Sequence, residues 1–277
     1  MQLSVIFICW NSLPHLRKAL ASMRETLNVA SSSEIIIIDN GSTDGTDDFI
    51  AARYPYAIYR RLSENRGVAY ARNRGIELAQ GEYIWLLDDD TIANAQTLRT
   101  MLCYMHETPQ CGICGCRLTD SSGNVQQSYK TYPGLGIKQR NLFHSIWQNN
   151  ILHIRLFNKK TTNRPHSDIQ SPSPDPYAEQ VAAGKPFEPV YIIGACQLIR
   201  RTVIEQIGML DQHIFYGPED ADFCIRAKKA GWHIAYLPQT TMIHQWQRIT
   251  NRNPFSPIAR RHIAALFYFY RKHRKIC

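Results

Sequence analysis

Apolar runs alternate with amphipathic stretches over the first 110 residues of the chain. Runs rich in β-branched and aromatic residues predict strands, here over residues 3–9, 34–38, 57–60 and 82–87. Between them, apolar spacing and capping residues predict helices over 11–27, 47–53 and 66–79. Strands that alternate with helices in this way predict an α/β fold, with a parallel sheet flanked by helices.

The rest of the chain is less regular. We expect helices over 97–108 and 136–157, and between them a hairpin over 111–130. Residues 158–189 contain several prolines and predict an irregular loop or an active-site lid. The later elements are a strand over 190–199, helices from Thr202 and over 219–230, and strands over 233–237 and 240–244. Together they predict one domain over 1–250, followed by a C-terminal helix within 254–277.

The strand over 82–87 leads directly into three carboxylates, Asp88, Asp89 and Asp90. Burying an unpaired carboxylate is costly, so this cluster is expected at an open strand end. Aspartates at the first and third positions can converge on one hard cation, Mg²⁺ or Mn²⁺. An acidic loop or a helix N-cap is the alternative. Asp39 ends another strand, and ligand sites lie beyond the carboxyl ends of parallel strands, which favours a shared site.

A second acidic cluster, formed by Glu219, Asp220 and Asp222, opens the predicted helix over 219–230. The helix dipole favours acids near a helix N-terminus, so capping is one interpretation of this cluster. His244 follows at the end of a later predicted strand. Two acidic clusters and one histidine indicate metal binding at one place and base chemistry at another.

The charge of the chain is concentrated at its C-terminus. The net charge is +9, and residues 248–277 contain eight Lys or Arg and no Asp or Glu. This tail includes the aromatic run 266–270, a combination typical of a helix that lies in the interface of an anionic membrane. A terminal helix docked on the core is the alternative. Because the rest of the chain is close to neutral, nucleic acid is not an expected partner.

The N-terminal segment over 1–9 is apolar but lacks a basic stretch and a small-residue cleavage site, so it predicts a strand and not a signal peptide. An apolar run of about 18 residues, as needed to span a membrane, is absent. The eight cysteines lie mostly in apolar stretches, as expected in a reducing cytoplasm. Cys111, Cys114 and Cys116 are interpreted as strand-packing residues, with a metal site as the alternative.

Six motifs carry a family resemblance that covers nearly all of residues 3–248. They are Ser4 to Asn11, Ile36 to Thr46, Asn65 to Ile76, Leu86 to Thr91, Gly194 to Arg201, and Gly208 through the Glu-Asp-x-Asp segment to His244. In this order and spacing they strongly resemble glycosyltransferase family 2, the inverting GT-A enzymes, and within it the rhamnosyltransferase-like branch. The resemblance implies a Rossmann-like, mixed and mostly parallel sheet flanked by helices.

The resemblance also implies roles for individual residues. Asp220 matches the catalytic base, with Glu219 beside it. Asp88 and Asp90 match the ends of the family's Asp-x-Asp motif. The implied metal ligands are Asp90, His244 and Asp88, and the implied nucleotide-sugar contacts are Asp39, Asn65, Arg72, Asp88 and Asp89.

Three of these residues have simpler interpretations. Asp39 can make an Asx turn, Arg72 can be a surface cation of a helix, and His244 can be a hydrogen-bonded histidine at a strand end. The choice between these interpretations and a binding role depends on where the fold places each side chain.

The expected function is metal-dependent, inverting transfer of a sugar from a nucleoside-diphosphate sugar to a saccharide, in surface polysaccharide synthesis. The resemblance favours dTDP-rhamnose as the donor and a lipid-linked saccharide as the acceptor. A UDP-hexose or UDP-N-acetylhexosamine is the alternative donor. An inactive, membrane-associated nucleotide-sugar-binding protein is the alternative from another class. We expect a cytoplasmic protein held on the inner face of the bacterial plasma membrane by its basic helix.

Overall fold

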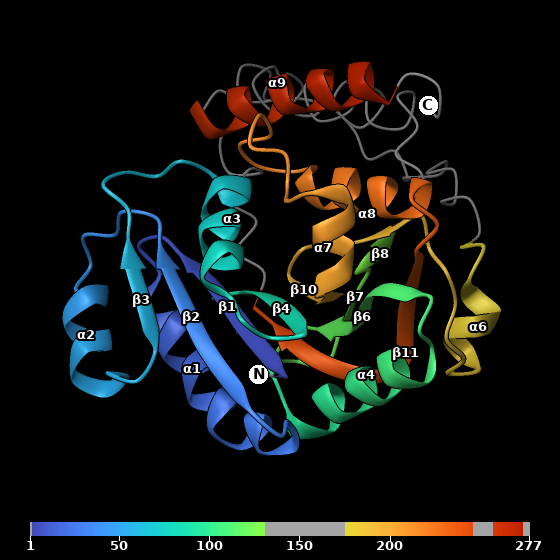
Figure 1. Ribbon diagram of the computed structural model, residues 1–277, viewed down its shortest axis with the longest axis horizontal. Helices are drawn as coiled ribbons and strands as arrows, with labels where there is room; N and C mark the ends of the chain where they lie inside the picture. Colours follow the sequence, from blue (N-terminus) through green and yellow to red (C-terminus); the bar gives the residue numbers. More distant parts are fainter. Residues whose placement is uncertain (1, 131–174, 246–256, 274–277) are drawn as a thin grey trace, which may run out of the picture.

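The computed structural model describes residues 2–130, 175–245 and 257–273 (Figure 1). Its helices are α1 (Leu13–Thr26), α2 (Thr46–Arg53), α3 (Val68–Leu78), α4 (Ala95–Glu107), α6 (Ala178–Ala182), α7 (Arg201–Ile207), α8 (Glu219–Lys229) and α9 (Pro257–Lys272), with a short 3₁₀ turn at Leu27–Val29. Its strands are β1 (Leu3–Cys9), β2 (Ser33–Asp39), β3 (Ile58–Arg61), β4 (Tyr83–Asp88), β5 (Thr91–Ile92), β6 (Cys111–Thr119), β7 (Val125–Gln126), β8 (Tyr129–Lys130), β9 (Tyr191–Ile192), β10 (Cys196–Arg200) and β11 (His233–His244). The helix expected over 136–157, and the part of the expected lid over 158–174, lie outside the described residues.

One large sheet organises the described part of the molecule. Its strand order is β3-β2-β1-β4-β10-β6-β11-β5, and β7 pairs with β6 at the side of this path. The strands β3, β2, β1 and β4 run parallel, as do β6 and β11. β10 is antiparallel to both of its neighbours, β4 and β6. The predicted α/β class with a mixed, mostly parallel sheet is therefore confirmed.

The sheet is covered by helices on both faces, because successive side chains of each strand point to opposite sides. In β4, Trp85 belongs to the apolar cluster that also contains Leu16 of α1 and Met101 of α4. Its neighbour Leu86 belongs to the cluster on the other face, with residues of α3, α7 and α8. Figure 1 shows these two layers of helices on either side of the sheet. The middle of the sheet is thus closed to solvent, which leaves the strand ends as the places that a ligand can reach.

The prediction of one continuous strand over 190–199 is wrong, because two separate strands, β9 and β10, lie there. β9 pairs with β8 in a separate two-stranded sheet, whereas β10 lies in the large sheet. Between them, Gly194 donates its amide hydrogen to Asp220 and accepts a hydrogen bond from Arg72. The amide and carbonyl of Gly194 are therefore hydrogen-bonded to side chains of the site, whereas in a continuous strand they would pair with a neighbouring strand.

Three further elements differ from the sequence prediction. The strands expected over 233–237 and 240–244 form one strand, β11, with an irregular register between Leu237 and Thr241. The helix α6 lies within the stretch expected to be irregular, and the two-residue strand β5 was not predicted. Elements as short as β5 have no periodicity from which to predict them. The strand interpretation of the cysteines holds, because Cys111, Cys114 and Cys116 are free, buried residues of β6.

The C-terminal helix α9 lies over α8, on the outside of the helix layer (Figure 1). Its side chains Ala265 and Phe269 are buried, whereas Arg260, Phe267 and Arg271 are exposed. The inner face of α9 is thus docked on the domain, and the outer face is basic and aromatic. Among the helices of the described residues, none combines the length and the apolar character needed to cross a membrane.

Candidate active site

Strand register brings the predicted acidic residues to one edge of the sheet. Cys9 of β1 pairs with Asp39 on one side, and Ile8 pairs with Asp88 on the other. After Asp88 the chain turns back as β5, where Thr91 pairs with His244 at the end of β11. Residues from the first and last parts of the domain therefore meet at the carboxyl end of β4.

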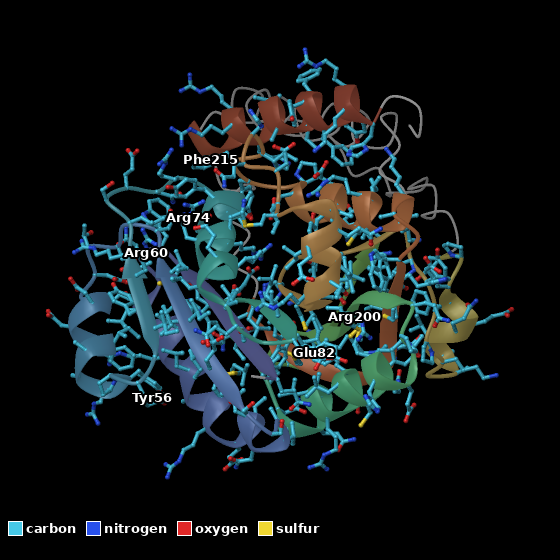
Figure 2. All side chains as sticks on the ribbon, viewed as in Figure 1. Tyr56, Arg60, Arg74, Glu82, Arg200 and Phe215 are labelled. Carbon is cyan, nitrogen blue, oxygen red and sulfur yellow. The ribbon has the colours of Figure 1, made fainter. Side chains whose placement is uncertain are left out.

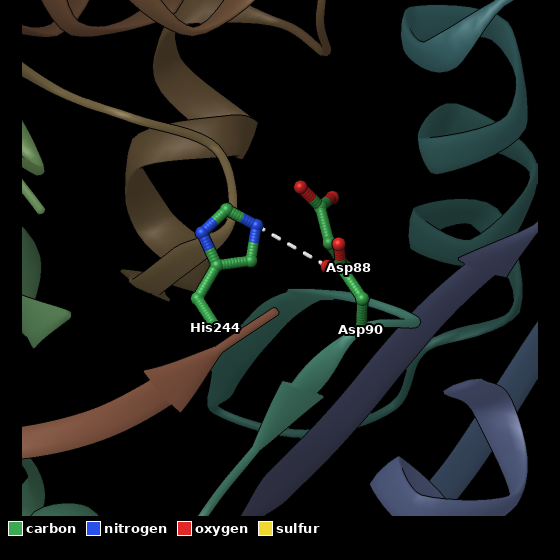
Figure 3. Close-up of side chains that lie close together, drawn as sticks. All are labelled: Asp88, Asp90 and His244. Carbon is green, nitrogen blue, oxygen red and sulfur yellow. Dashed lines mark ion pairs between the residues drawn. The ribbon is translucent and has the colours of Figure 1, made fainter. Parts of the chain in front are cut away.

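Asp88, Asp90 and His244 form a group that can hold a metal ion (Figure 3). One ligand atom from each of them lies within 4.8 Å of the others. His244 Nε2 lies 3.2 Å from Asp90 Oδ1. Apart from this ion-pair contact, that buried oxygen has no hydrogen-bond partner among the described residues. Two carboxylates and an imidazole suit Mg²⁺ or Mn²⁺, so the residues present fit the cation that the sequence predicts.

The second ring nitrogen of His244, Nδ1, is hydrogen-bonded to Gln126. Gln126 of β7 receives a hydrogen bond from His244 Nδ1 at 2.8 Å, and its own amide nitrogen donates to the His244 carbonyl at 2.7 Å. This arrangement directs Nε2 towards Asp90 and the position of a cation. Burial by itself would lower the pKa of His244, but the contact with Asp90 outweighs it and raises the pKa.

Arg72 of α3 joins this group to the second acidic cluster. Its side chain is only 2% exposed. One Nη donates to Asp88 at 2.7 Å, and the other lies 3.4 Å from Glu219 Oε1. Burial would lower the pKa of Arg72, but Asp88, Glu219 and Asp220 together raise it, so the guanidinium remains charged. Instead of lying on the helix surface, Arg72 is a buried cation shared by the two clusters.

Gly194 fixes the position of this guanidinium. Its carbonyl accepts a hydrogen bond from Arg72 at 2.8 Å, and a Cβ added at residue 194 would lie 2.1 Å from Arg72 Nη1. The amide of Gly194 donates to Asp220 Oδ2 at 3.0 Å. One glycine therefore contacts both the shared cation and the proposed base, and no other residue type fits this approach.

Glu219 and Asp220 open α8 but differ in their surroundings. Glu219 is 5% exposed, and its Oε2 is buried without a partner among the described residues. Burial, reinforced by repulsion from Asp220, raises the pKa of Glu219 to about 7, although Arg72 opposes the shift. Asp220 is half-buried. Of the two carboxylates, Asp220 is the more accessible to a ligand.

Asp39 and Asn65 occupy separate hydrogen-bonded groups. Asp39 is fully buried and accepts hydrogen bonds from the Ser42 amide and the Tyr59 hydroxyl, each at 2.7 Å. The contact with Ser42, three residues along the chain, is a local capping bond of the turn after β2. Asn65 accepts from Asn40 and from the Gly67 amide at the start of α3, each at 3.0 Å. Both residues shape the loops at the strand ends.

Asp89, the middle member of the triplet, does not belong to the group of described residues that can hold a metal ion. It accepts a hydrogen bond from the hydroxyl of Ser12, the residue that precedes α1, and another from the Trp10 amide. Burial raises its pKa well above the ordinary value. Asp89 therefore ties the loop after β4 to the β1–α1 junction.

The structure also reveals site residues that the sequence motifs did not indicate. Gln126, Ser12 and Tyr59 each orient a predicted site residue, but they lie in short or unremarkable segments without a spacing signal. Tyr216 precedes α8, and burial together with Asp88, Glu219 and Asp220 raises its pKa to about 12. The Glu-Asp-x-Asp spacing was a usable signal for Asp222, which is fully buried beneath α9.

Solved structures show which known fold the chain adopts. A mannosyltransferase from Pyrobaculum calidifontis, in complex with GDP-Man and Mn²⁺, matches with a TM-score of 0.62 at 17% identity, covering 100% of this chain and 65% of that one. GalNAc-T7 with UDP, GalNAc and Mn²⁺ matches with a TM-score of 0.61 at 15% identity, covering 98% of this chain and 50% of that one. These matches show that the chain has the GT-A fold, as predicted.

The sequence shows the family and the activity class. The model of glycosyl transferase family 2 matches residues 4–208, so the chain belongs to that family and is a glycosyltransferase, as predicted. An N-acetylglucosaminyl-diphospho-decaprenol L-rhamnosyltransferase from Mycobacterium tuberculosis is 28% identical over 287 residues, covering 98% of this chain and 85% of that protein. The uncharacterized glycosyltransferase YfnE of Bacillus subtilis is 27% identical over 261 residues, covering 88% and 65%. The predicted likeness to rhamnosyltransferases is confirmed.

Proposed function

We propose that this glycosyltransferase moves a sugar from a nucleoside-diphosphate donor to a lipid-linked saccharide in one inverting, metal-dependent step. The observation that carries the proposal is the bridge made by Arg72. This single buried cation contacts Asp88 in the metal group and lies 3.4 Å from Glu219, beside Asp220. The proposed leaving-group site and the proposed base site are therefore neighbours, so that one sugar ring can lie between them.

On the donor side, Asp88, Asp90 and His244 are the residues proposed to hold a divalent cation. When bound, such a cation stabilises the negative charge of a departing nucleoside diphosphate as a Lewis acid. Asp39, Asn65 and Asp89 are proposed to shape the nucleotide-sugar site through the loops they hold. Arg72 is proposed to act on the donor indirectly, by orienting Asp88.

On the acceptor side, Asp220 is proposed to take the proton from the attacking hydroxyl. The Gly194 amide fixes one of its carboxylate oxygens at 3.0 Å. The N-terminal position in α8 favours the ionised form that a base needs. Because the helix dipole also weakens basicity, alignment of the hydroxyl contributes more than proton affinity. Glu219 is proposed to orient the site from its buried position.

The substrates are proposed from the relatives. The mycobacterial relative is named for L-rhamnosyl transfer to N-acetylglucosaminyl-diphospho-decaprenol. By this similarity we propose dTDP-rhamnose as the donor and an N-acetylglucosaminyl diphospholipid as the acceptor. A UDP-hexose or UDP-N-acetylhexosamine is the alternative donor, and Mn²⁺ or Mg²⁺ is the proposed cation. Surface polysaccharide synthesis would use such a reaction.

A lipid-linked acceptor requires access to a membrane, and α9 offers a surface for it. Arg260, Ala264, Phe267 and Arg271 follow one another at helical spacing and are all exposed, with Phe267 at 74%. Cations around an exposed aromatic ring suit an anionic lipid surface. We propose that this face holds the domain, residues 1–250, on the cytoplasmic side of a bacterial plasma membrane.

The substitution Asp220→Asn tests the proposed chemistry. A general base typically contributes about 100-fold or more to a rate, so kcat for rhamnosyl transfer to an N-acetylglucosaminyl diphospholipid should fall by about that factor. Affinity for dTDP with Mn²⁺, measured by calorimetry, should be unchanged. Asp48→Asn on the exposed surface of α2 is the matched control. Unchanged kcat in Asp220→Asn would exclude Asp220 as the general base. A wild-type protein that binds dTDP but transfers no sugar from any nucleotide donor would favour the alternative of an inactive binding protein.

A further inference from the structure

The inner face of α9 contacts the segment that leads to the proposed base. Ala265 and Phe269 of α9 are buried, at 3% and 0% exposure. The polar side chains on either side of them converge on residues 211–222 of the domain. This segment contains the loop before α8 and the first turn of α8, where Glu219 and Asp220 lie.

Asp222 is the centre of this contact. It is fully buried and lies two residues after Asp220. Its Oδ1 accepts from Lys272 at 2.7 Å and from His273 Nε2 at 2.8 Å, and its Oδ2 accepts from Arg226 at 2.8 Å. Burial would raise the pKa of Asp222, but Lys272, Arg226 and His273 together lower it. Two of the three partners therefore come from the C-terminal helix and its last turn.

The loop before α8 is held by the same helix. Asp211 accepts hydrogen bonds from Lys272 at 2.6 Å and from Tyr268 at 2.9 Å. His262 Nδ1 lies 2.9 Å from the carbonyl oxygens of both Tyr216 and Gly217. The loop is thus fixed to α9 at its beginning and at its end, directly before Glu219.

A further contact extends this support to the nucleotide side. The Phe215 carbonyl accepts a hydrogen bond from the Val68 amide at the start of α3, at 2.8 Å. The Arg261 guanidinium lies 4.3 Å from the centre of the Phe215 ring. Figure 2 shows Phe215 between α9 and α3. Arg72, the cation shared by the two acidic clusters, is on the same helix, α3.

We propose that α9 positions the catalytic base, with His273 and Lys272 holding Asp222 and thereby the first turn of α8. This inference rests on the proposed role of Asp220. A helix turn is stiff, so a displacement of Asp222 is passed to Asp220 through the backbone. Without Lys272 and His273, Asp222 would be a buried carboxylate paired only with Arg226. That state lowers the stability of the folded protein and favours movement of the first turn of α8. His273 and Lys272 are positioning residues, because neither contacts the proposed base directly in the described structure.

The position of the contact separates it from the proposed membrane surface. His273 is 2% exposed and faces Asp222, whereas Phe267 lies on the outer face of α9 at 74% exposure. A change at His273 should therefore affect the chemical step without changing attachment to lipid. This separation makes the positioning role distinguishable from loss of membrane binding.

The substitution His273→Leu is the main test, made in the full chain. It removes the N–H donor to Asp222 while retaining a buried side chain of similar size. We expect kcat for rhamnosyl transfer to fall by about tenfold or more, since small misplacements of a reacting group can cost about 100-fold. KM for dTDP-rhamnose, and flotation with vesicles of phosphatidylglycerol and phosphatidylethanolamine, should be unchanged. His106→Leu, at an exposed position of α4, is the matched control.

Two companion variants keep the test decisive. His273→Gln retains a hydrogen-bond donor and should recover part of the lost kcat. Lys272→Met removes a partly exposed partner of Asp222 without disturbing the core, and should lower kcat by a smaller factor. Hydrogen exchange, measured by mass spectrometry, should speed up in residues 211–222 of His273→Leu and stay unchanged around Asp88 to Asp90.

The outcomes separate this inference from the proposed function. A wild type that transfers no sugar from any tested nucleotide donor refutes the proposed function. An active wild type, with kcat and exchange at 211–222 unchanged in His273→Leu and Lys272→Met, refutes the positioning role alone. A proportional loss of flotation and transfer in His273→Leu would also refute it, since the helix would then act only as an anchor.

Discussion

The most informative stability prediction concerns Glu219, a buried acid whose pKa is raised to about 7 from an ordinary value of 4.5. Between these two pH values the folded state retains the proton and the unfolded state loses it. The protonated carboxyl thus contributes stability that is fully present below about pH 4.5 and is lost as the pH rises through about 7. The substitution Glu219→Gln removes this titration while keeping the shape of the side chain.

The magnitude follows from the size of the shift. At 1.36 kcal/mol for each pH unit, the difference between 4.5 and about 7 corresponds to about 3 kcal/mol. The side chain is only 7% exposed, so solvent screens little of this energy. Glu219→Gln should therefore match the wild type near pH 4.5 and exceed its unfolding free energy by about 3 kcal/mol at pH 8.

Urea denaturation at pH 4.5, 6, 7 and 8, with a chelator present, measures this difference. Glu25→Gln, at an exposed position of α1, controls for the general effect of removing a negative charge. If Glu219→Gln were less stable than the wild type at pH 8, the attraction of Arg72 would outweigh burial and the reasoning would be wrong. A difference that did not vary with pH would also contradict it.

Two further predictions concern residues that support the site. Gln126→Leu removes the hydrogen bond that orients His244, so Mn²⁺ affinity measured by calorimetry should fall by about 10- to 100-fold. The control Gln127→Leu should leave the Mn²⁺ affinity unchanged, and equal affinities in the two variants would show that Gln126 has no orienting role. Gly194→Ala places a Cβ 2.1 Å from Arg72 Nη1 and should displace the guanidinium, lowering kcat by about 100-fold with the fold intact by circular dichroism. Wild-type kcat in Gly194→Ala would refute the bridging role of Arg72.

The sequence was most informative where the signal is local. The apolar runs over 3–9 and 82–87 correspond to β1 and β4 within about one residue, because strand patterning depends on neighbouring side chains. The placement of acids at strand ends was predictable for the same reason. Elements that depend on distant partners were not: β9 and β10 separate because Asp220 and Arg72 bind the backbone of Gly194.

The interpretation of single residues shows the same division. The sequence indicated a metal group at Asp88 and Asp90, and the pairing of β11 with β5 brings His244 to it. Arg72 was expected to contact the nucleotide, and the structure places it between Asp88 and Glu219 with 2% of its side chain exposed. Nothing in the local pattern of α3 distinguishes a surface arginine from this buried one, because the difference lies in what packs over it.

By itself, the sequence determined the α/β class, the acidic strand ends, the acids that open α8 and the basic character of the tail. These features arise from residues that are neighbours in the chain or on one turn of a helix. The tertiary structure decided which carboxylates share a cation, that Asp89 binds Ser12 and not the metal group, and that α9 binds Asp222 with one face while exposing Phe267 on the other. Such pairings join residues far apart in the chain, and only the packing of the sheet and its helices brings them within hydrogen-bonding distance.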